Sequence, residues 1–188
     1  SAYCGERDLL RSAGCEVLEY TRHSDEVRGR GRIGALYGGL ATPWNPWAAR
    51  SLAAEARRFL PDVVHVHNTF PLISPAVFHA LADGPAAVVM TLHNFRTVCA
   101  SAMLMRGDSG CTECLDRRSV LPALRHACYR DSRAATAPLA LSIALHRRLG
   151  TWRRHVDAYI TLTRFQREMF RGAGYPDNAL PVSYTHLT

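Results

Sequence analysis

Polar side chains follow two apolar runs of the sequence at the point where each run ends. The run DVVHVHN ends in His67 and Asn68, and the run AAVVMTLHN ends in His93 and Asn94. Neutral imidazole and carboxamide groups both donate and accept hydrogen bonds, which suits the hydroxyl groups of sugars. If the two runs are parallel strands, their carboxyl ends share one edge of a sheet, where open α/β folds bind ligands. We therefore expect these residues to form one site.

The same histidines also have a structural interpretation. A single histidine at a strand end more often satisfies local hydrogen bonds than binds a ligand. Side chains alternate along a strand, so His65 and His67 point to the same side, and one of them could merely pack against a helix. Two separate strands that both end in His-Asn favour a site.

A second group of chemically active residues is a set of four cysteines with the spacing C-x11-C-x2-C-x13-C: Cys99, Cys111, Cys114 and Cys128. A C-x2-C pair lets two thiolates reach one ion, and two distant cysteines complete a tetrahedral site. The segment between them is rich in turn residues and poor in apolar ones, so it lacks a core of its own. Structural Zn²⁺, disulfides or free thiols, and an iron–sulfur cluster remain as alternatives. Cys4 and Cys15 stand apart, and Cys15 is predicted to lie in a buried strand.

Composition and missing motifs exclude several functions. The 188 residues are 47% hydrophobic and 21% charged, which is typical of one globular domain. No run approaches the 18 or so apolar residues of a membrane span. Hydrolase and P-loop motifs are absent, and the serine-protease-like GDSGC lies in the Cys-rich segment without supporting context. The net charge of +7 comes from arginines spread along the chain, which argues against nucleic-acid binding but suits phosphate or anionic lipid.

Hydrophobic periodicity and capping signals predict alternating strands and helices. Asn45-Pro46, Ser74-Pro75 and Thr163 are typical helix starts, and Gly14 is a typical helix end. The predicted strands cover residues 16–21, 62–68, 86–94 and 157–163; the predicted helices follow Asn45, Ser74 and Thr163 and cover 133–149; residues 24–43 are predicted to be a loop with a short helix.

These elements predict an α/β fold: a Rossmann-like parallel sheet flanked by helices. The central strands are continuous apolar runs, which indicates a sheet buried on both faces. We expect one domain over residues 1–182 that includes the Cys-rich insert at 99–128, followed by a non-native tail at 183–188.

Four blocks of the sequence resemble a known family: PDVVHVHNTFPLISPAV, VVMTLHNFRTVC, RGDSGCTEC, and RHACYRDSRAA with the ALHRRLGTWRRHVDAYITLTRFQREMF that follows. Over about residues 6–181 the chain is similar to the N-terminal domain of bacterial glycosyltransferases of the glycosyltransferase-4-like kind, in a Cys-containing subgroup. The resemblance implies the N-terminal half of a GT-B fold and a retaining transferase that needs no catalytic metal. It also implies a nucleotide-sugar donor and a sugar or lipid-linked acceptor.

The resemblance assigns roles residue by residue. His93 would be the catalytic residue that faces the donor sugar. The substrate-binding residues would be Asn94 and Arg96 on the same rim, His67, Asn68 and Phe70 on the acceptor side, and Thr163 at a helix start.

The resemblance also sets expectations for the whole enzyme. The first strand and the entire nucleotide-sugar domain are expected to be missing, so the chain alone is expected to be inactive. The expected setting is cell-envelope or exopolysaccharide synthesis in the cytoplasm, with peripheral contact to the anionic inner face of the membrane. Two alternatives remain: a non-catalytic zinc-stapled binding module, and a nucleotide-sugar epimerase of similar architecture.

Overall fold

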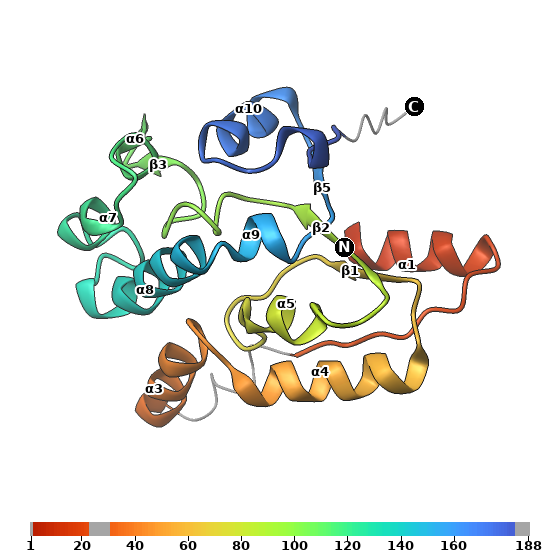
Figure 1. Ribbon diagram of the computed structural model, residues 1–188. Helices are drawn as coiled ribbons and strands as arrows, with labels where there is room; N and C mark the ends of the chain where they lie inside the picture. Colours follow the sequence, from red (N-terminus) through yellow and green to blue (C-terminus); the bar gives the residue numbers. More distant parts are fainter. Residues whose placement is uncertain (1, 23–30, 183–188) are drawn as a thin grey trace.

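A three-stranded parallel sheet forms the centre of the protein in the computed structural model, which describes residues 2–22 and 31–182. The strands are β1 (Val63–Val66), β2 (Ala87–Leu92) and β5 (Ala158–Thr161), in the order β1-β2-β5 (Figure 1). Residues 87–90 of β2 pair with β1, and residues 89–92 pair with β5. The predicted parallel α/β fold is confirmed.

Helices connect and flank these strands. Between β2 and β5 the chain first passes through the Cys-rich insert, then through the long helix α8. The helices outside the insert are α1 (Ala2–Ser12), α3 (Gly31–Ala41), α4 (Pro46–Phe59), α5 (Ala76–Leu81), α8 (Arg133–Leu149), α9 (Thr151–Arg154), α10 (Arg164–Gly172) and the 3₁₀ turn η1 (Asp177–Ala179). In Figure 1, α4 and α5 lie on one side of the strands and α10 lies on the other.

The start of α4 agrees with its sequence signal. The Asn45 side chain accepts a hydrogen bond from the backbone N–H of Ala48, and Pro46 occupies the first helical position. The helix ends where Leu60 adopts a left-handed conformation with φ of 52°. The Asn45 cap at the start of α4 satisfies a backbone N–H group that no earlier carbonyl of the helix can reach.

The sequence predicts a helix that starts at Ser74-Pro75, but Ser74 does not occupy the capping position. Helix α5 begins at Ala76 after Pro75, and Ser74 itself has a φ of 62°. The Ser74 hydroxyl accepts from the backbone N–H groups of Ala76 at 3.3 Å and of Asn45 at 2.8 Å. It therefore joins the start of α5 to the start of α4.

The main core lies between the sheet and its helices. Aromatic side chains fill its centre: Phe78, Tyr159 and Phe170 are fully buried. Leu92 at the end of β2 and Leu180 after η1 complete it. Burying each large apolar side chain contributes roughly 1.5–3 kcal/mol, so this cluster holds the strand ends in fixed positions.

The predicted strand at residues 16–21 is not formed. Residues 15–22 carry no strand assignment, and Cys15 is exposed rather than buried. A strand needs a neighbouring ladder, and among the described residues none pairs with this segment. Side chains hold it instead, because Glu19 binds Arg7 and Arg11 of α1 and the Tyr20 hydroxyl donates to the Ala48 carbonyl.

The insert between β2 and α8 has only short elements. These are β3 (Met105–Arg106), β4 (Ser109–Gly110), α6 (Glu113–Asp116) and α7 (Leu121–Arg125). Its small apolar cluster joins Ala100 and Ala123 to Leu139 and Ile143 of α8. The insert therefore packs on α8. The predicted tail at 183–188 and residues 23–30 lie outside the described residues.

Candidate functional site

The two strand-end histidines meet at one edge of the sheet. His67 follows β1 directly and His93 follows β2 directly. Nδ1 of His67 lies 3.0 Å from Nε2 of His93, and the two rings stack with centroids 5.3 Å apart. The parallel pairing of β1 with β2 places the two side chains together, as predicted.

A carboxylate of α1 joins the histidines, which the sequence analysis missed. Oε1 of Glu6 lies 2.6 Å from Nδ1 of His65, and Oε2 lies 3.6 Å from Nε2 of His67. The other nitrogen of His65 contacts the Thr91 hydroxyl at 2.8 Å. The Tyr3 ring meets His67 edge-on at 5.3 Å. Glu6 is about 60 residues away from these partners in sequence, so local periodicity contains no signal for the contact.

Desolvation favours the neutral form of the His67 and His93 imidazoles. The pKa of His67 is lowered by burial first and then by the nearby His65, although Glu6 opposes this shift. The pKa of His93 is also lowered, mainly because neighbouring groups partly desolvate its ring, although the residue as a whole is exposed. Neutral imidazole carries one donor and one acceptor nitrogen, so a hydrogen-bond chain can be assigned.

The direction of that chain follows from the carboxylate, which only accepts. Nδ1–H of His65 donates to Glu6, and Nε2–H of His67 faces the same carboxylate. Nδ1 of His67 then accepts from Nε2–H of His93. This arrangement leaves a lone pair on Nδ1 of His93, an exposed residue, which can accept a hydrogen bond from a ligand hydroxyl.

The two asparagines have the same structural role on both strands. The Asn68 side chain accepts from the backbone N–H of Phe70 at 3.0 Å. The Asn94 side chain accepts from the backbone N–H of Arg96 at 2.9 Å. Each bond turns the chain just past the strand, as asparagine does in many turns.

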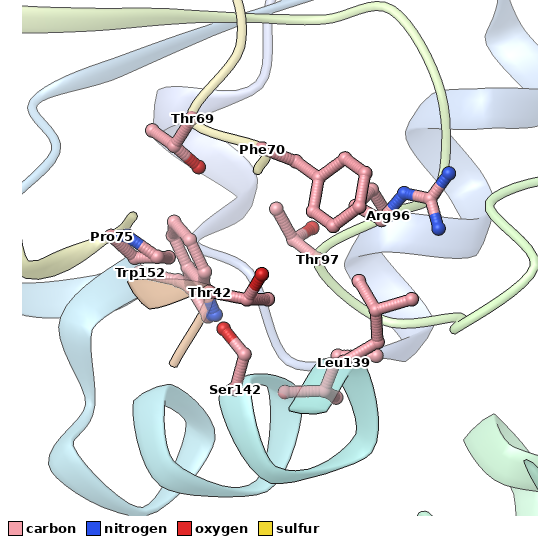
Figure 2. A pocket seen from close by; sticks show the side chains of 10 residues that line it. Thr42, Thr69, Phe70, Pro75, Arg96, Thr97, Leu139, Ser142 and Trp152 are labelled. Carbon is pink, nitrogen blue, oxygen red and sulfur yellow. The ribbon is translucent and has the colours of Figure 1, made fainter. Parts of the chain in front are cut away.

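Phe70 and Arg96, each two residues after one of these asparagines, contact each other. The Arg96 guanidinium lies 4.8 Å from the centroid of Phe70 and 5.3 Å from that of Tyr129. Arg96 also donates to the Ala100 carbonyl at 2.6 Å. Both Phe70 and Arg96 line a small pocket next to the strand ends (Figure 2).

Thr163 lies at the start of α10 and caps it. Its hydroxyl accepts from the Gln166 backbone N–H at 3.0 Å. The Gln166 side chain does not bond back to the Thr163 backbone N–H, as it would in a capping box. It accepts from the Leu162 N–H at 2.8 Å and donates to the Leu92 carbonyl at 2.6 Å, joining α10 to the end of β2.

The four cysteines of the insert lie near one another and are half-buried: Cys99, Cys111, Cys114 and Cys128. The pKa of Cys114 is raised to about 11 by burial first, with smaller contributions from the other three thiols. The pKa of Cys128 is raised by burial and by Cys99 and Cys111.

Metal-binding geometry is found elsewhere in the described part of the chain. There, only Glu6, His65 and His67 bring three ligand atoms within 4.8 Å of one another. The cysteine sulfurs do not form such a group. Zinc would require them to approach to roughly 3.8 Å of each other.

Comparisons with known proteins give one match. The sequence model of the family described as Glycosyltransferase Family 4 matches residues 8–185. No curated protein and no solved structure matches the chain significantly. Within the described residues, every helix is too short or too polar to cross a bilayer.

Proposed function

The chain belongs to glycosyltransferase family 4, and on this premise we propose that the edge formed by His67 and His93 binds substrate during sugar transfer. The observation that carries the proposal is the 3.0 Å contact between the two imidazoles, which come from strands 26 residues apart. Enzymes of this family typically need no cofactor for catalysis, so none is assigned a step.

The proposed role of His93 is to hold a sugar hydroxyl. Its Nδ1 accepts a hydrogen bond from the hydroxyl group, while His67 and Glu6 fix the orientation of the ring. A sugar hydroxyl held in this way loses little entropy on reaching the transition state. The donor is a nucleotide-sugar and the acceptor is a sugar or a lipid-linked sugar.

The surrounding residues receive supporting roles in this proposal. Asn68 and Asn94 shape the turns that present the site, and their side-chain N–H groups donate to substrate oxygens. Phe70 and Arg96 border it with an aromatic face and a guanidinium. The setting we propose is cell-envelope or exopolysaccharide synthesis at the cytoplasmic face of the membrane.

A His93→Ala substitution in the complete gene product tests the proposal. Transfer of labelled sugar from a panel of nucleotide-sugars to a lipid extract should fall on the order of 100-fold, because substrate orientation is lost. The midpoint of thermal unfolding should stay close to wild type, since His93 is exposed. Near wild-type turnover would show that His93 does not bind substrate.

Two controls accompany this experiment. His126→Ala changes a histidine of the insert that contacts Glu113 and Arg106, and it should leave transfer unchanged. Omitting the acceptor distinguishes the epimerase alternative, because an epimerase would consume nucleotide-sugar at full rate without it.

We also propose that the insert binds one structural Zn²⁺ through Cys99, Cys111, Cys114 and Cys128. The other three thiols lie close enough to Cys114 to raise its pKa, and the surrounding elements are short, which supports this proposal; the sulfurs would move closer together on binding. Short helices and two-residue strands supply little stability alone, and a metal would hold them together.

A further inference from the structure

A buried hydrogen-bond donor without a partner points into the pocket of Figure 2. Trp152 is 6% exposed, and its Nε1–H is the single buried side-chain nitrogen or oxygen in the described residues that lacks a hydrogen bond. Leaving such a group unpaired costs roughly 1–3 kcal/mol. A donor of this kind calls for an oxygen or nitrogen lone pair inside the pocket.

The hydroxyl groups that share the pocket define the missing ligand further. Thr42 already donates its proton to the Gly38 carbonyl at 2.7 Å, so its oxygen can only accept from a ligand. The Ser142 hydroxyl lines the same pocket, and a hydroxyl group can donate or accept. A group that accepts from Trp152 and donates to Thr42 must carry both a lone pair and a proton. A water molecule or an alcohol fits, whereas a carboxylate or an ammonium group does not.

The volume of the hollow limits the ligand to a small group. It measures about 30 Å³, above the roughly 10–15 Å³ that one water needs and far below the roughly 150 Å³ of a cavity that holds benzene. A whole sugar ring is therefore excluded. A single hydroxyl or hydroxymethyl group can enter.

The position of the pocket connects it to the histidine edge. Thr69 and Phe70 line it just after His67, and Arg96 lines it just after His93. In Figure 2, Phe70 and Arg96 lie on the opposite side of the hollow from Trp152 and Ser142. The hollow is partly open to solvent, so a ligand held at the edge can extend one arm inward.

We propose that this pocket binds a water molecule between Trp152 and Thr42, and that a hydroxyl arm of the sugar acceptor replaces this water during binding. The second half rests on the proposed transferase function, whereas the first half depends only on the pocket. The shared chemistry is an oxygen that both donates and accepts.

Water-exchange NMR on the wild-type chain tests the first half, and it depends on no variant. The chain has three tryptophans, and Trp44 and Trp47 are 39% and 68% exposed, so their indole N–H signals serve as internal controls. The Trp152 indole proton should show a cross-peak to a long-lived water, and Trp152→Phe identifies the signal by removing it. Absence of this cross-peak, with no response to sugar, would overturn the proposal.

Titration with methyl glycosides tests the second half. Glucoside, galactoside and mannoside are each compared with their 6-deoxy forms, because the hydroxymethyl group is the most extended arm of a hexose. We expect a saturable shift of the Trp152 signal with at least one hexoside, and at least about tenfold weaker binding of its 6-deoxy form. A persistent water without any sugar response would identify a structural water only and overturn the acceptor arm.

Transfer assays separate this inference from the proposed function. If Trp152→Phe and Thr42→Val leave the acceptor KM unchanged while His93→Ala abolishes transfer, the acceptor arm is wrong and the function stands. If the Trp152 signal responds to hexosides while His93→Ala transfers sugar at the wild-type rate, the pocket does bind a sugar hydroxyl and the role assigned to His93 is wrong.

Discussion

The histidine and the asparagine of each His-Asn pair form different kinds of hydrogen bond. His67 and His93 bond to each other across the strands, whereas Asn68 and Asn94 each accept from the backbone N–H two residues later. Repetition of the dipeptide therefore reflects repetition of one local structure, a strand that ends in a tight turn. The turns aim the residues after them, including Phe70 and Arg96, toward a common region.

Thr163 has an observed structural role in addition to the predicted substrate contact. Its hydroxyl caps α10 by accepting from Gln166. Thr163→Ala should lower the free energy of unfolding by about 1 kcal/mol, because one helical N–H loses its acceptor. Urea unfolding measures the loss.

Thr163→Asn is the matched variant, since asparagine caps helices as well as threonine does. It should restore stability. If it also keeps transfer at wild-type level in the complete protein, the residue acts as a cap. A large rise in the acceptor KM with stability intact would instead support the predicted substrate contact.

Among the secondary-structure elements, the strands and the longer helices could be predicted because their signals are local. Apolar runs indicated β1, β2 and β5, and caps indicated α4 and α10. The segment at 16–21 has an equally good strand pattern, but a strand also depends on a neighbour, which a local pattern does not report. The contact of Glu6 with the histidines and the orphan indole of Trp152 depend on tertiary packing and leave no sequence periodicity.

The insert is the element whose stability is least explained by its own packing. Few of its apolar side chains are buried, and apart from Leu104 these are small, such as Ala100 and Ala123. Six non-glycine residues from 102 to 131 have positive φ values, which cost free energy for residues with a Cβ atom. An additional restraint is expected to balance this cost.

Zinc is the proposed restraint. Protein produced in reducing cytosol should contain about one equivalent of zinc by elemental analysis. Cys114→Ser should lose the metal and lower the thermal midpoint, because a buried ligand is removed. Cys15→Ser is the control, since Cys15 is exposed and outside the insert, and it should keep the metal.

Other results would assign the cysteines differently. Less than about a tenth of an equivalent of metal together with four reactive thiols would exclude a metal site. If thiol counting shows that the four cysteines form two disulfides, these would stabilise the insert in place of zinc. Bound iron together with absorption of visible light would indicate an iron–sulfur cluster.

At the scale of the whole molecule, a buried histidine junction ties together helices that are far apart in sequence. Nε2–H of His146 in α8 donates to the Pro43 carbonyl just before α4 at 2.9 Å. Nδ1 of His146 accepts from the Thr151 hydroxyl at 2.9 Å, and that oxygen accepts from His79 of α5 at 2.8 Å. The junction links the start of α4 with α5, α8 and α9, and it therefore helps to position Trp152, which lies in α9.

This junction makes stability depend on pH. Burial first, and then the nearby His155 and His146, lower the pKa of His79 from 6.5 to about 4. Between these two pH values the unfolded chain binds a proton that the folded chain does not. The contribution of neutral His79 to the free energy of unfolding is therefore complete above pH 6.5 and is lost as the pH falls toward 4. His79 is partly exposed, so we expect its share of the loss to be on the order of 1 kcal/mol, less than full burial would give.

Urea unfolding between pH 4.5 and 7.5 measures this slope in the wild type and in His79→Gln. Glutamine can still donate to Thr151 but cannot be protonated in this range, so the variant should lose part of the pH dependence while staying folded. Some slope should remain, because burial also lowers the pKa of His146. Equal slopes in the wild type and His79→Gln would show that protonation of His79 does not control the junction.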